Sequence, residues 1–212
     1  MKKAFTLIEI IFVLVVIGIL AAVLIPRTER DPLREAAIQI VSDIRYTQHL
    51  AMVDDKYDSA DSNWYRNRWQ LLFGKSSVNA KNTGGKYAYT IFSDYKSTSQ
   101  GTPDPDEMAV NPLDKTKLLS GGFSSGLDWE DERATKKLNI GYSYDIDSVT
   151  NSGCGRANRI AFDNIGRPFQ GNDKNWNSST ESVLKEKCTF TLHKGSEIIN
   201  IYIEPESGYV HL

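Results

Sequence analysis

The 212-residue sequence is poor in the residues that build catalytic and metal centres, because it has only two cysteines and three histidines. The histidines lack the short spacing of zinc ligands, and neither an HExxH motif nor a phosphate-binding loop is present. These absences argue against a metalloenzyme and a nucleotide hydrolase. We therefore predict a protein that is not an enzyme, with no cofactor, no metal ligand and no catalytic residue. The histidines are His49, His193 and His211.

The sequence also lacks an excess of either charge, since 25 Lys and Arg residues against 27 Asp and Glu residues give a net charge of -2. Residues 28–212 alone carry a net charge of -4. Nucleic-acid-binding domains usually show a basic excess or a basic stripe, so we do not expect a nucleic-acid partner. Only one long apolar run occurs, which excludes a protein with several membrane spans.

That run extends from Phe5 to Ile25, where 18 of 21 residues are apolar. As a helix it would be about 31 Å long, which matches the hydrocarbon core of a bilayer. Lys2 and Lys3 precede it and predict a cytoplasmic N-terminus. A plain membrane anchor fits this pattern, and so does a secretory signal peptide, although such peptides usually have about 7–15 apolar residues. Glu9 favours a third interpretation, because a carboxylate in an inserted helix costs about 2.5–3.5 kcal/mol.

The segment from Lys2 to Glu9, followed by the apolar run and Pro26, resembles the N-terminus of type IV prepilins and type II secretion pseudopilins. The resemblance implies that a prepilin peptidase cuts between Ala4 and Phe5 and then N-methylates Phe5. The family usually has Gly before the cut, and Ala4 is a small residue that we expect the peptidase to accept. In a filament, the Glu9 carboxylate would pair with the Phe5 amine of a neighbouring subunit, so that two costly charges compensate each other. Residues 1–4 would be the leader, and residues 5–27 the transmembrane and assembly helix.

A second, amphipathic helix is predicted within residues 28–56. Asp31 and Pro32 suit an N-cap followed by the first helical position. Beyond them, apolar residues recur at spacings of three, four and seven, which predicts a stripe that packs on the rest of the chain. The periodicity is lost from Asp54 onward. The stripe comprises Leu33, Ala37, Ile40, Val41, Ile44, Ala51 and Met52 or Val53.

Residues 57–212 differ in character from the two helices. Short runs of aromatic and β-branched residues alternate with clusters of Gly, Asn, Asp and Ser, which predicts strands joined by turns. Residues 163–166, 194–195 and 205–208 have the composition of hairpin turns. Residues 94–136 predict a loop-rich insertion on the sheet. The predicted strands are Trp69–Phe73, Lys86–Phe92, Leu138–Tyr144, Arg159–Phe162, Thr189–His193, Ile198–Glu204 and Tyr209–Leu212.

These patterns predict an α+β fold, in which a long N-terminal helix with a transmembrane half and an amphipathic half packs on a mainly antiparallel sheet. Two C-terminal segments add to the family resemblance. Residues 160–167 resemble the F-D-x-x-G-R hairpin of H-type minor pseudopilins and their pilus counterparts, and residues 201–210 resemble their final S-G-x-V hairpin. The family usually has Arg after Ser-Gly, whereas this chain has Tyr209.

Cys154 and Cys188 are the two cysteines. Since the resemblance places the body in an oxidising compartment, the pair predicts a disulfide that holds the C-terminal hairpins to the sheet. It would close a loop of about 35 residues and contribute roughly 3–4 kcal/mol. The alternative is a pair of unpaired buried thiols. Acidic clusters at residues 104–107 and 145–147 suit solvated loops better than calcium sites, because neither has the EF-hand pattern.

The resemblance therefore implies a minor pseudopilin, a structural subunit of a type II secretion or type IV pilus-like filament that serves protein secretion. Its partners would be other pseudopilins or pilins, the prepilin peptidase and an inner-membrane assembly platform. It would cross the bacterial inner membrane once, with a periplasmic head. The alternative is a minor type IV pilin that binds DNA during natural transformation, and the net charge of -4 weighs against it. An anchored periplasmic enzyme is a weaker interpretation, because no catalytic constellation supports it.

Overall fold

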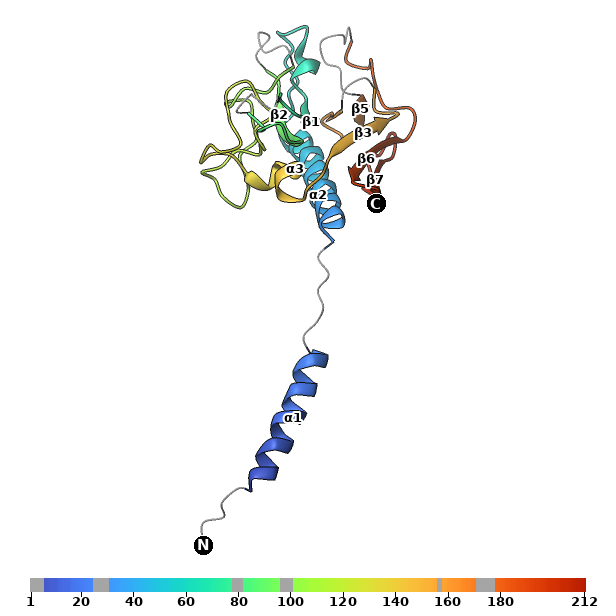
Figure 1. Ribbon diagram of the computed structural model, residues 1–212. Coiled ribbons are helices and arrows are strands. Elements are labelled where there is room, and N and C mark those ends of the chain that lie inside the picture. The colour runs from blue at the N-terminus through green and yellow to red at the C-terminus, as the bar shows by residue number, and fades with distance from the viewer. Residues whose placement is uncertain (1–5, 25–30, 78–81, 96–100, 156–157, 171–177) are drawn as a thin grey trace. The chain divides into compact units, whose positions relative to one another are not determined.

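The computed structural model describes residues 6–24, 31–77, 82–95, 101–155, 158–170 and 178–212. The chain divides into two compact units, residues 1–31 and residues 32–212 (Figure 1). We call the second unit the head. It contains all of the strands that the structure describes.

The first unit contains helix α1 (Leu7–Leu24). Its sequence is almost continuously apolar, and every side chain from Leu7 to Ala21 is exposed. The predicted apolar run begins at Phe5 and ends at Ile25, so both of its ends lie outside the described residues. Among the residues that the structure describes, no helix combines the length and the apolar character that a membrane crossing requires.

The head begins with helix α2 (Pro32–Val53), as the Asp31-Pro32 pair predicts. The predicted apolar stripe faces the interior along most of the helix, and Ile40 is fully buried. The prediction is wrong at the C-terminal end, because Met52 and Val53 are 47% and 63% exposed. The buried residues of α2 are Leu33, Ala36, Ala37, Ile40, Val41, Ile44, Thr47 and Ala51.

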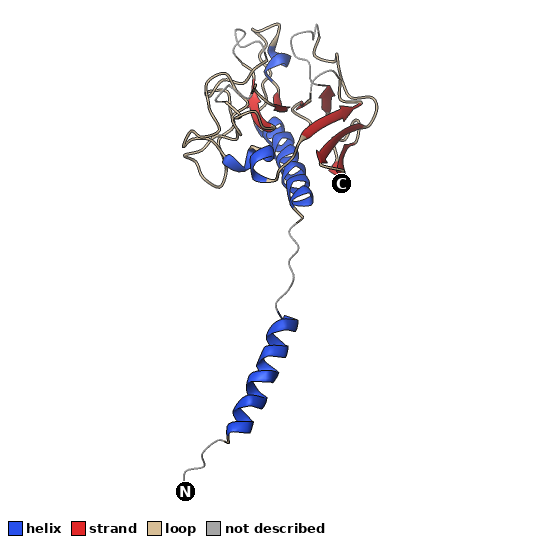
Figure 2. Ribbon diagram, in the orientation of Figure 1, coloured by secondary structure: helices blue, strands red, loops and turns tan. Residues whose placement is uncertain are grey.

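The described strands form two four-stranded sheets in which all neighbouring strands are antiparallel, which confirms the α+β class (Figure 2). The sequence analysis predicted one sheet, whereas the described strands form two. The first has the order β2-β1-β4-β5 and the second the order β3-β6-β7-β8. The strands are β1 (Trp69–Gly74), β2 (Ala88–Ser93), β3 (Ser148–Ser152), β4 (Arg159–Phe162), β5 (Pro168–Gln170), β6 (Cys188–Lys194), β7 (Glu197–Ile203) and β8 (Val210–His211).

Helix α2 packs against both sheets, touching β1 and β4 of the first and β6, β7 and β8 of the second. Aromatic side chains fill the space between the sheets. The ring of Phe73 on β1 lies 5.1 Å from that of Phe190 on β6 and 5.4 Å from that of Tyr89 on β2. One continuous core therefore joins α2 to both sheets.

The prediction of a strand at Leu138–Tyr144 is wrong. This segment forms a 3-10 turn, η2 (Lys136–Leu138), and a short helix, α3 (Ile140–Ser143). The side chain of Asn139 accepts a hydrogen bond from the Tyr142 N–H at 3.1 Å and so caps α3. A second 3-10 turn, η1 (Trp64–Asn67), precedes β1, and strand β3 was not predicted. Strand β5 is the returning strand of the hairpin that the turn at residues 163–166 predicts.

The segment 101–135 adds backbone pairing to the free edge of β2, although it forms no extended strand. The Ile91 N–H donates to the Leu119 carbonyl at 2.9 Å, and the Ala109 N–H donates to the Ile91 carbonyl at 2.9 Å. Its apolar side chains form a second, smaller core with Leu72 and Phe92. Because this segment covers their outer face, β1 and β2 are buried on both sides.

Candidate assembly site

The predicted assembly carboxylate, Glu9, lies in the first turn of α1. Its Oε2 accepts hydrogen bonds from the Thr6 N–H at 3.1 Å and from the Thr6 hydroxyl at 3.2 Å. In return, the Glu9 N–H donates to the Thr6 hydroxyl oxygen at 3.4 Å. This reciprocal arrangement is a capping box, in which each residue satisfies a backbone donor that the first helical turn leaves free.

The capping box gives Glu9 a partner within its own chain, which the sequence analysis missed. The signal was readable, because Thr followed three residues later by Glu before an apolar run is the capping-box pattern. A carboxylate at a helix N-terminus also interacts favourably with the helix dipole. Ala4 and Phe5, the residues of the predicted cleavage, lie outside the described residues.

Beyond Glu9, α1 presents apolar side chains on all sides. Phe12 is 69% exposed and Leu14 is 62% exposed, although they lie on different faces of the helix. A helix that is apolar all round normally becomes buried in a protein core or in lipid. The first unit itself supplies no such cover for the described part of α1.

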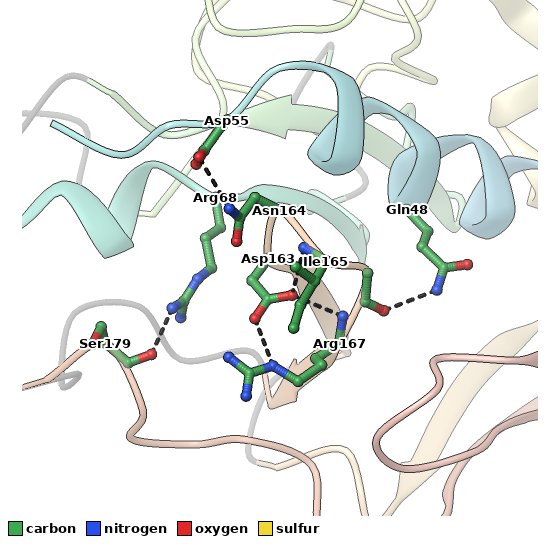
Figure 3. Close-up of polar contacts among 9 residues, drawn as sticks. Gln48, Asp55, Arg68, Asp163, Asn164, Ile165, Arg167 and Ser179 are labelled. Carbon is green, nitrogen blue, oxygen red and sulfur yellow. Dashed lines mark hydrogen bonds and ion pairs between the residues drawn. The ribbon is translucent and has the colours of Figure 1, made fainter.

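In the head, the two hairpin turns that carry the family resemblance lie on α2. The first turn is built around Asp163, whose carboxylate is only 4% exposed (Figure 3). This carboxylate accepts the N–H groups of Ile165 at 3.2 Å and of Arg167 at 2.8 Å. It also accepts the Nε–H of Arg167 at 2.8 Å, which forms an ion pair. The F-D-x-x-G-R pattern therefore specifies a turn that is closed by its own side chains.

Gln48 of α2 joins the first turn to the second. Its Nε2 donates to the carbonyl of Gly166 at 2.8 Å, as Figure 3 shows, and to the carbonyl of Ser207 at 3.0 Å. The close approach requires glycine, because a Cβ on Gly208 would lie 2.6 Å from the Gly166 carbonyl oxygen. Gly208 also has a φ of +63°. No local pattern identifies Gln48 as a functional residue, because its partners are more than 100 residues away in the sequence.

Arg68 lies behind the first turn and is 4% exposed. Its guanidinium carbon lies 3.8 Å from the centre of the Phe169 ring, and its Nη2 donates to the Ser179 carbonyl at 2.5 Å. Burial lowers the pKa of Arg68 to about 10, while the charge of Asp163 acts in the opposite direction. A hydrogen bond of 3.0 Å from Asn164 to Asp55 fixes the other side of the turn (Figure 3).

The position at which the family has Arg is held by Tyr209, which is 58% exposed. A guanidinium is nevertheless close by, since Arg45 of α2 lies 5.8 Å from the centre of the Tyr209 ring. Arg45 also donates to the Val210 carbonyl at 2.6 Å. The next ring along β8, that of His211, stacks on Tyr209 at 5.4 Å and contacts Glu204 at 3.1 Å. This end of the head therefore exposes aromatic and charged groups together.

Cys154 and Cys188 form the predicted disulfide, with their Cα atoms 4.7 Å apart. Both residues are fully buried. Cys188 begins β6, and Cys154 follows the end of β3, the strand that pairs with β6. The bridge therefore fastens the β6–β7 hairpin to β3 within the second sheet and does not join the two sheets.

The acidic clusters take part in turns. Asp147 accepts the Gly195 N–H at 2.7 Å, and Glu107 accepts the Asp104 N–H at 3.1 Å. Within the described ranges, no group of three or more His, Cys, Asp or Glu side chains could hold a metal ion. Residues 122–126 match Gly-x-Ser-x-Gly, a hydrolase pattern that the sequence analysis overlooked. Its Ser124 is buried, and its hydroxyl donates to the Leu127 carbonyl at 2.8 Å, so this serine closes a turn.

Comparison with known proteins gives a match at the N-terminus. Residues 1–25 match the prokaryotic N-terminal methylation motif. No curated protein and no solved structure matches the chain significantly. The motif supports a type IV pilin or pseudopilin, a structural subunit that a prepilin peptidase processes and that assembles with other pilins.

Proposed function

We propose that this chain is an H-type minor pseudopilin, a structural subunit of the periplasmic filament of a type II secretion system or a related type IV pilus-like machine. The observation that carries the proposal is the N-terminal methylation motif, combined with an apolar α1 that bears a single carboxylate in its first turn. A filament subunit needs both features, because the helix must be covered by lipid before assembly and by neighbouring subunits afterwards.

In this proposal, residues 1–4 are a leader on the cytoplasmic side of the inner membrane. The peptidase cuts between Ala4 and Phe5, methylates the Phe5 amine, and leaves residues 5–27 as a single-pass anchor. Residues 28–56 form the amphipathic stalk, and residues 57–212 form the β-rich part of the periplasmic head. The Cys154–Cys188 disulfide supports this orientation, because disulfides persist in the oxidising periplasm and are rare in the cytosol.

Glu9 would then act in register selection. Before assembly, its carboxylate is held by the N–H and hydroxyl of Thr6. In the filament, it pairs with the methylated Phe5 amine of an adjacent subunit. Only a neighbour at the correct axial position satisfies both charges, so the pair specifies register more than it contributes net stability.

The H-type assignment rests on the two C-terminal hairpins. Their turns lie together on α2 through Gln48, so the two sequence patterns describe one structural unit. The other pseudopilins or pilins, the prepilin peptidase and the inner-membrane assembly platform are the expected partners. A role in DNA uptake has no comparable support, because residues 28–212 carry a net charge of -4.

The test is mass spectrometry of the full chain purified from native membranes, with a peptidase-deficient strain as the control. We expect an N-methyl-Phe5 terminus in the wild-type strain and an uncut leader in the control strain. An N-terminus near Ala22 or Val23 would identify a secretory signal peptide and contradict the proposal. Deletion of the gene should then abolish protein secretion, whereas loss of transformation alone would support the DNA-uptake alternative.

A further inference from the structure

Strand β7 is only partly covered on the side that faces away from β6. Strand β8 pairs with its last two residues, where Tyr202 lies opposite His211 and Ile203 lies opposite Val210. Among the residues that the structure describes, no strand pairs with residues 197–201 along this edge. In Figure 1, β7 lies at the margin of the head, beside the C-terminal end. The first part of β7 is therefore an open sheet edge.

The backbone groups at this edge are directed away from β6. In an antiparallel sheet, alternate residues of a strand direct both their N–H and their C=O to the same side. The Glu204 N–H donates to the Tyr209 carbonyl at 2.9 Å, which is on the side of β8. Counting back in steps of two, Ile198 and Asn200 direct their backbone groups to that side as well. Since β8 does not reach them, these groups are available to an incoming strand.

The sequence of this edge offers little protection against strand pairing. Native proteins commonly protect an open edge with Lys, Pro or a β-bulge. Residues 197–201 contain neither Lys nor Pro, and the register with β6 runs without a bulge. Their only charge is Glu197, which lies next to the hairpin turn, and the β-branched Ile198 is 60% exposed. The edge is therefore a suitable template for strand addition.

A shallow groove lies on the path that an added strand would take. The groove encloses about 400 Å³ between α2 and the end of β8. Ile38 is 53% exposed and Leu212 is 44% exposed, so its walls are largely apolar. Volumes of this order are ample for one aliphatic side chain. The lining residues are Ile38, Val41, Ser42, Arg45, His211 and Leu212.

Two contacts of α2 fix the direction of that path. Gln48 bonds the Ser207 carbonyl and Arg45 bonds the Val210 carbonyl, so the chain runs towards the N-terminal end of α2 as it enters β8. A strand that continues this line along the open edge of β7 therefore passes Ile38. Its alternate side chains face α2, as that of Val210 does, and one of them enters the groove.

The charge of the groove indicates the chemistry of its partner. Arg45 is the only lining residue with a permanent side-chain charge, and its guanidinium is positioned by the hydrogen bond to Val210. The exposed Tyr209 lies beside it, and Arg and Tyr are enriched among the residues that dominate binding energies. The surface thus complements an extended segment that carries an apolar side chain and a carboxylate.

We propose that such a segment of a different, neighbouring pilin adds to the β7 edge as a strand in line with β8. Main-chain hydrogen bonds to Ile198 and Asn200 provide affinity, whereas the groove and Arg45 provide specificity. The proposal rests on the proposed function, in which the filament neighbours of a minor subunit are other pilins. It names the surface through which one of these neighbours binds.

A single short strand buries too little area to hold two free heads together. The contact forms where membrane helices already hold two subunits side by side, because tethering raises the effective concentration of the segment. The experiment must therefore use the full chain in its membrane.

The test is photocrosslinking in native membranes, with benzoylphenylalanine in place of Ile198. The control carries the same photoreactive residue in place of Tyr142, which is 64% exposed on α3. Mass spectrometry identifies the crosslinked chain. We expect a product with another pilin from position 198 and little or none from position 142. Ile38→Asp should lower the yield from position 198 roughly tenfold, because it places a charge in the apolar groove, and it alters only an exposed side chain.

A second pair of variants tests the backbone contact itself. The photoreactive residue now replaces Ser42, which is exposed and lines the groove. Ile198→Pro removes the N–H that faces away from β6 and leaves the pairing with β6 intact. Ile198→Thr keeps this N–H and a β-branched side chain. We expect Ile198→Pro to lower crosslinking of position 42 to the same pilin roughly tenfold, and Ile198→Thr to change it less than twofold.

Assembly is measured separately, as co-purification with other pilins that Glu9→Ala abolishes. Co-purification without a pilin product from position 198 would overturn the inference and leave the proposed function intact. Equal yields from positions 198 and 142 would also overturn it, as would a product with a second copy of this chain only. Equal effects of Ile198→Pro and Ile198→Thr would exclude strand addition. Absence of both co-purification and crosslinking would overturn the inference together with the filament function.

Discussion

The two long helices of this protein are apolar in different ways. Helix α2 has one apolar stripe, and the residues of that stripe are buried against two sheets of the same chain. Helix α1 has apolar side chains on every face, and all of its described side chains are exposed. The amphipathic pattern of α2 is thus satisfied within the head, whereas an all-round apolar pattern is typical of a helix that is buried on every side, in a large protein core or in lipid. The sequence of α2 therefore determines how this helix packs in the head, and we propose that the sequence of α1 determines assembly.

The strongest test of this division is the loss of the Glu9 charge. We expect Glu9→Ala to leave the head folded, since the head is a separate compact unit, but to abolish assembly and transport. The physical reason is that a neighbour's Phe5 amine would remain uncompensated in a low-dielectric setting. Crosslinking to other pilins and a secretion assay measure the loss.

Glu9→Gln is the matched control, because its amide oxygen can still accept the hydrogen bonds from Thr6 but carries no charge. If Glu9→Gln assembles normally, capping and not charge is the function of this residue. Degradation of the head in either variant would show that α1 also affects folding, and would contradict separate roles for the two helices.

The second test concerns α2, where two isoleucines differ only in the face that they occupy. Ile40 is fully buried, whereas Ile38 is 53% exposed. We expect Ile40→Ala to lower the free energy of unfolding of the head by about 2–5 kcal/mol, and Ile38→Ala to change it by about 0.5 kcal/mol or less. Thermal unfolding of the two full-length variants in the same detergent provides the comparison. If both variants lowered the free energy of unfolding equally, burial of the apolar stripe would not be what stabilises the head.

The sequence predicted the elements whose signals are local. The stripe of α2, the turns at residues 163–166 and 205–208, and strand β4 needed only periodicity or turn composition. The capping box of Thr6 and Glu9 was equally local and could have been recognised.

The remaining features depend on distant partners. The strand predicted at Leu138–Tyr144 has suitable residues, but the Asn139 cap and a hydrogen bond of 2.8 Å from the Gly141 N–H to Tyr87 fix a helical turn there. The division into two sheets depends on β1 pairing with β4 across about 90 residues, and the role of Gln48 depends on still longer separations. Periodicity carries no information on such pairings.

A third test uses a titratable contact between α2 and the first sheet. The Asp43 carboxylate accepts the Tyr89 hydroxyl at 2.5 Å, and burial raises its pKa from 3.8 to about 6. Because the folded state binds this proton more tightly than the unfolded state, the contribution of Asp43 to stability is present below about pH 4 and is lost as the pH rises through about 6. The loss amounts to about 3 kcal/mol at most.

Asp43→Asn removes the titration and keeps an acceptor for Tyr89. We expect the variant to be more stable than the wild type at pH 7.5, with the difference shrinking towards pH 4. Thermal unfolding of both proteins across this range measures it. A stability difference that is constant with pH would show that Asp43 does not titrate in this window. The buried carboxylate of α2 would then not differ in this respect from the exposed, capped carboxylate of α1.

The smallest expected effect concerns Thr6, which holds Glu9 through two donors. Thr6→Val removes the hydroxyl but keeps the N–H, so one of the two hydrogen bonds to the carboxylate remains. Loss of a capping hydroxyl typically costs about 0.5–2 kcal/mol of helix stability, and the remaining bond places the expected cost at the lower end of that range. We therefore expect assembled protein to fall about two- to threefold, since a tenfold change requires about 1.4 kcal/mol.

Thr6→Ser, which retains the hydroxyl, should assemble like the wild type. The assembled fraction, measured by co-purification with other pilins, separates the two variants. If Thr6→Val and Thr6→Ser assemble equally well, the hydroxyl does not position the carboxylate, and Glu9 depends on its neighbouring subunit alone.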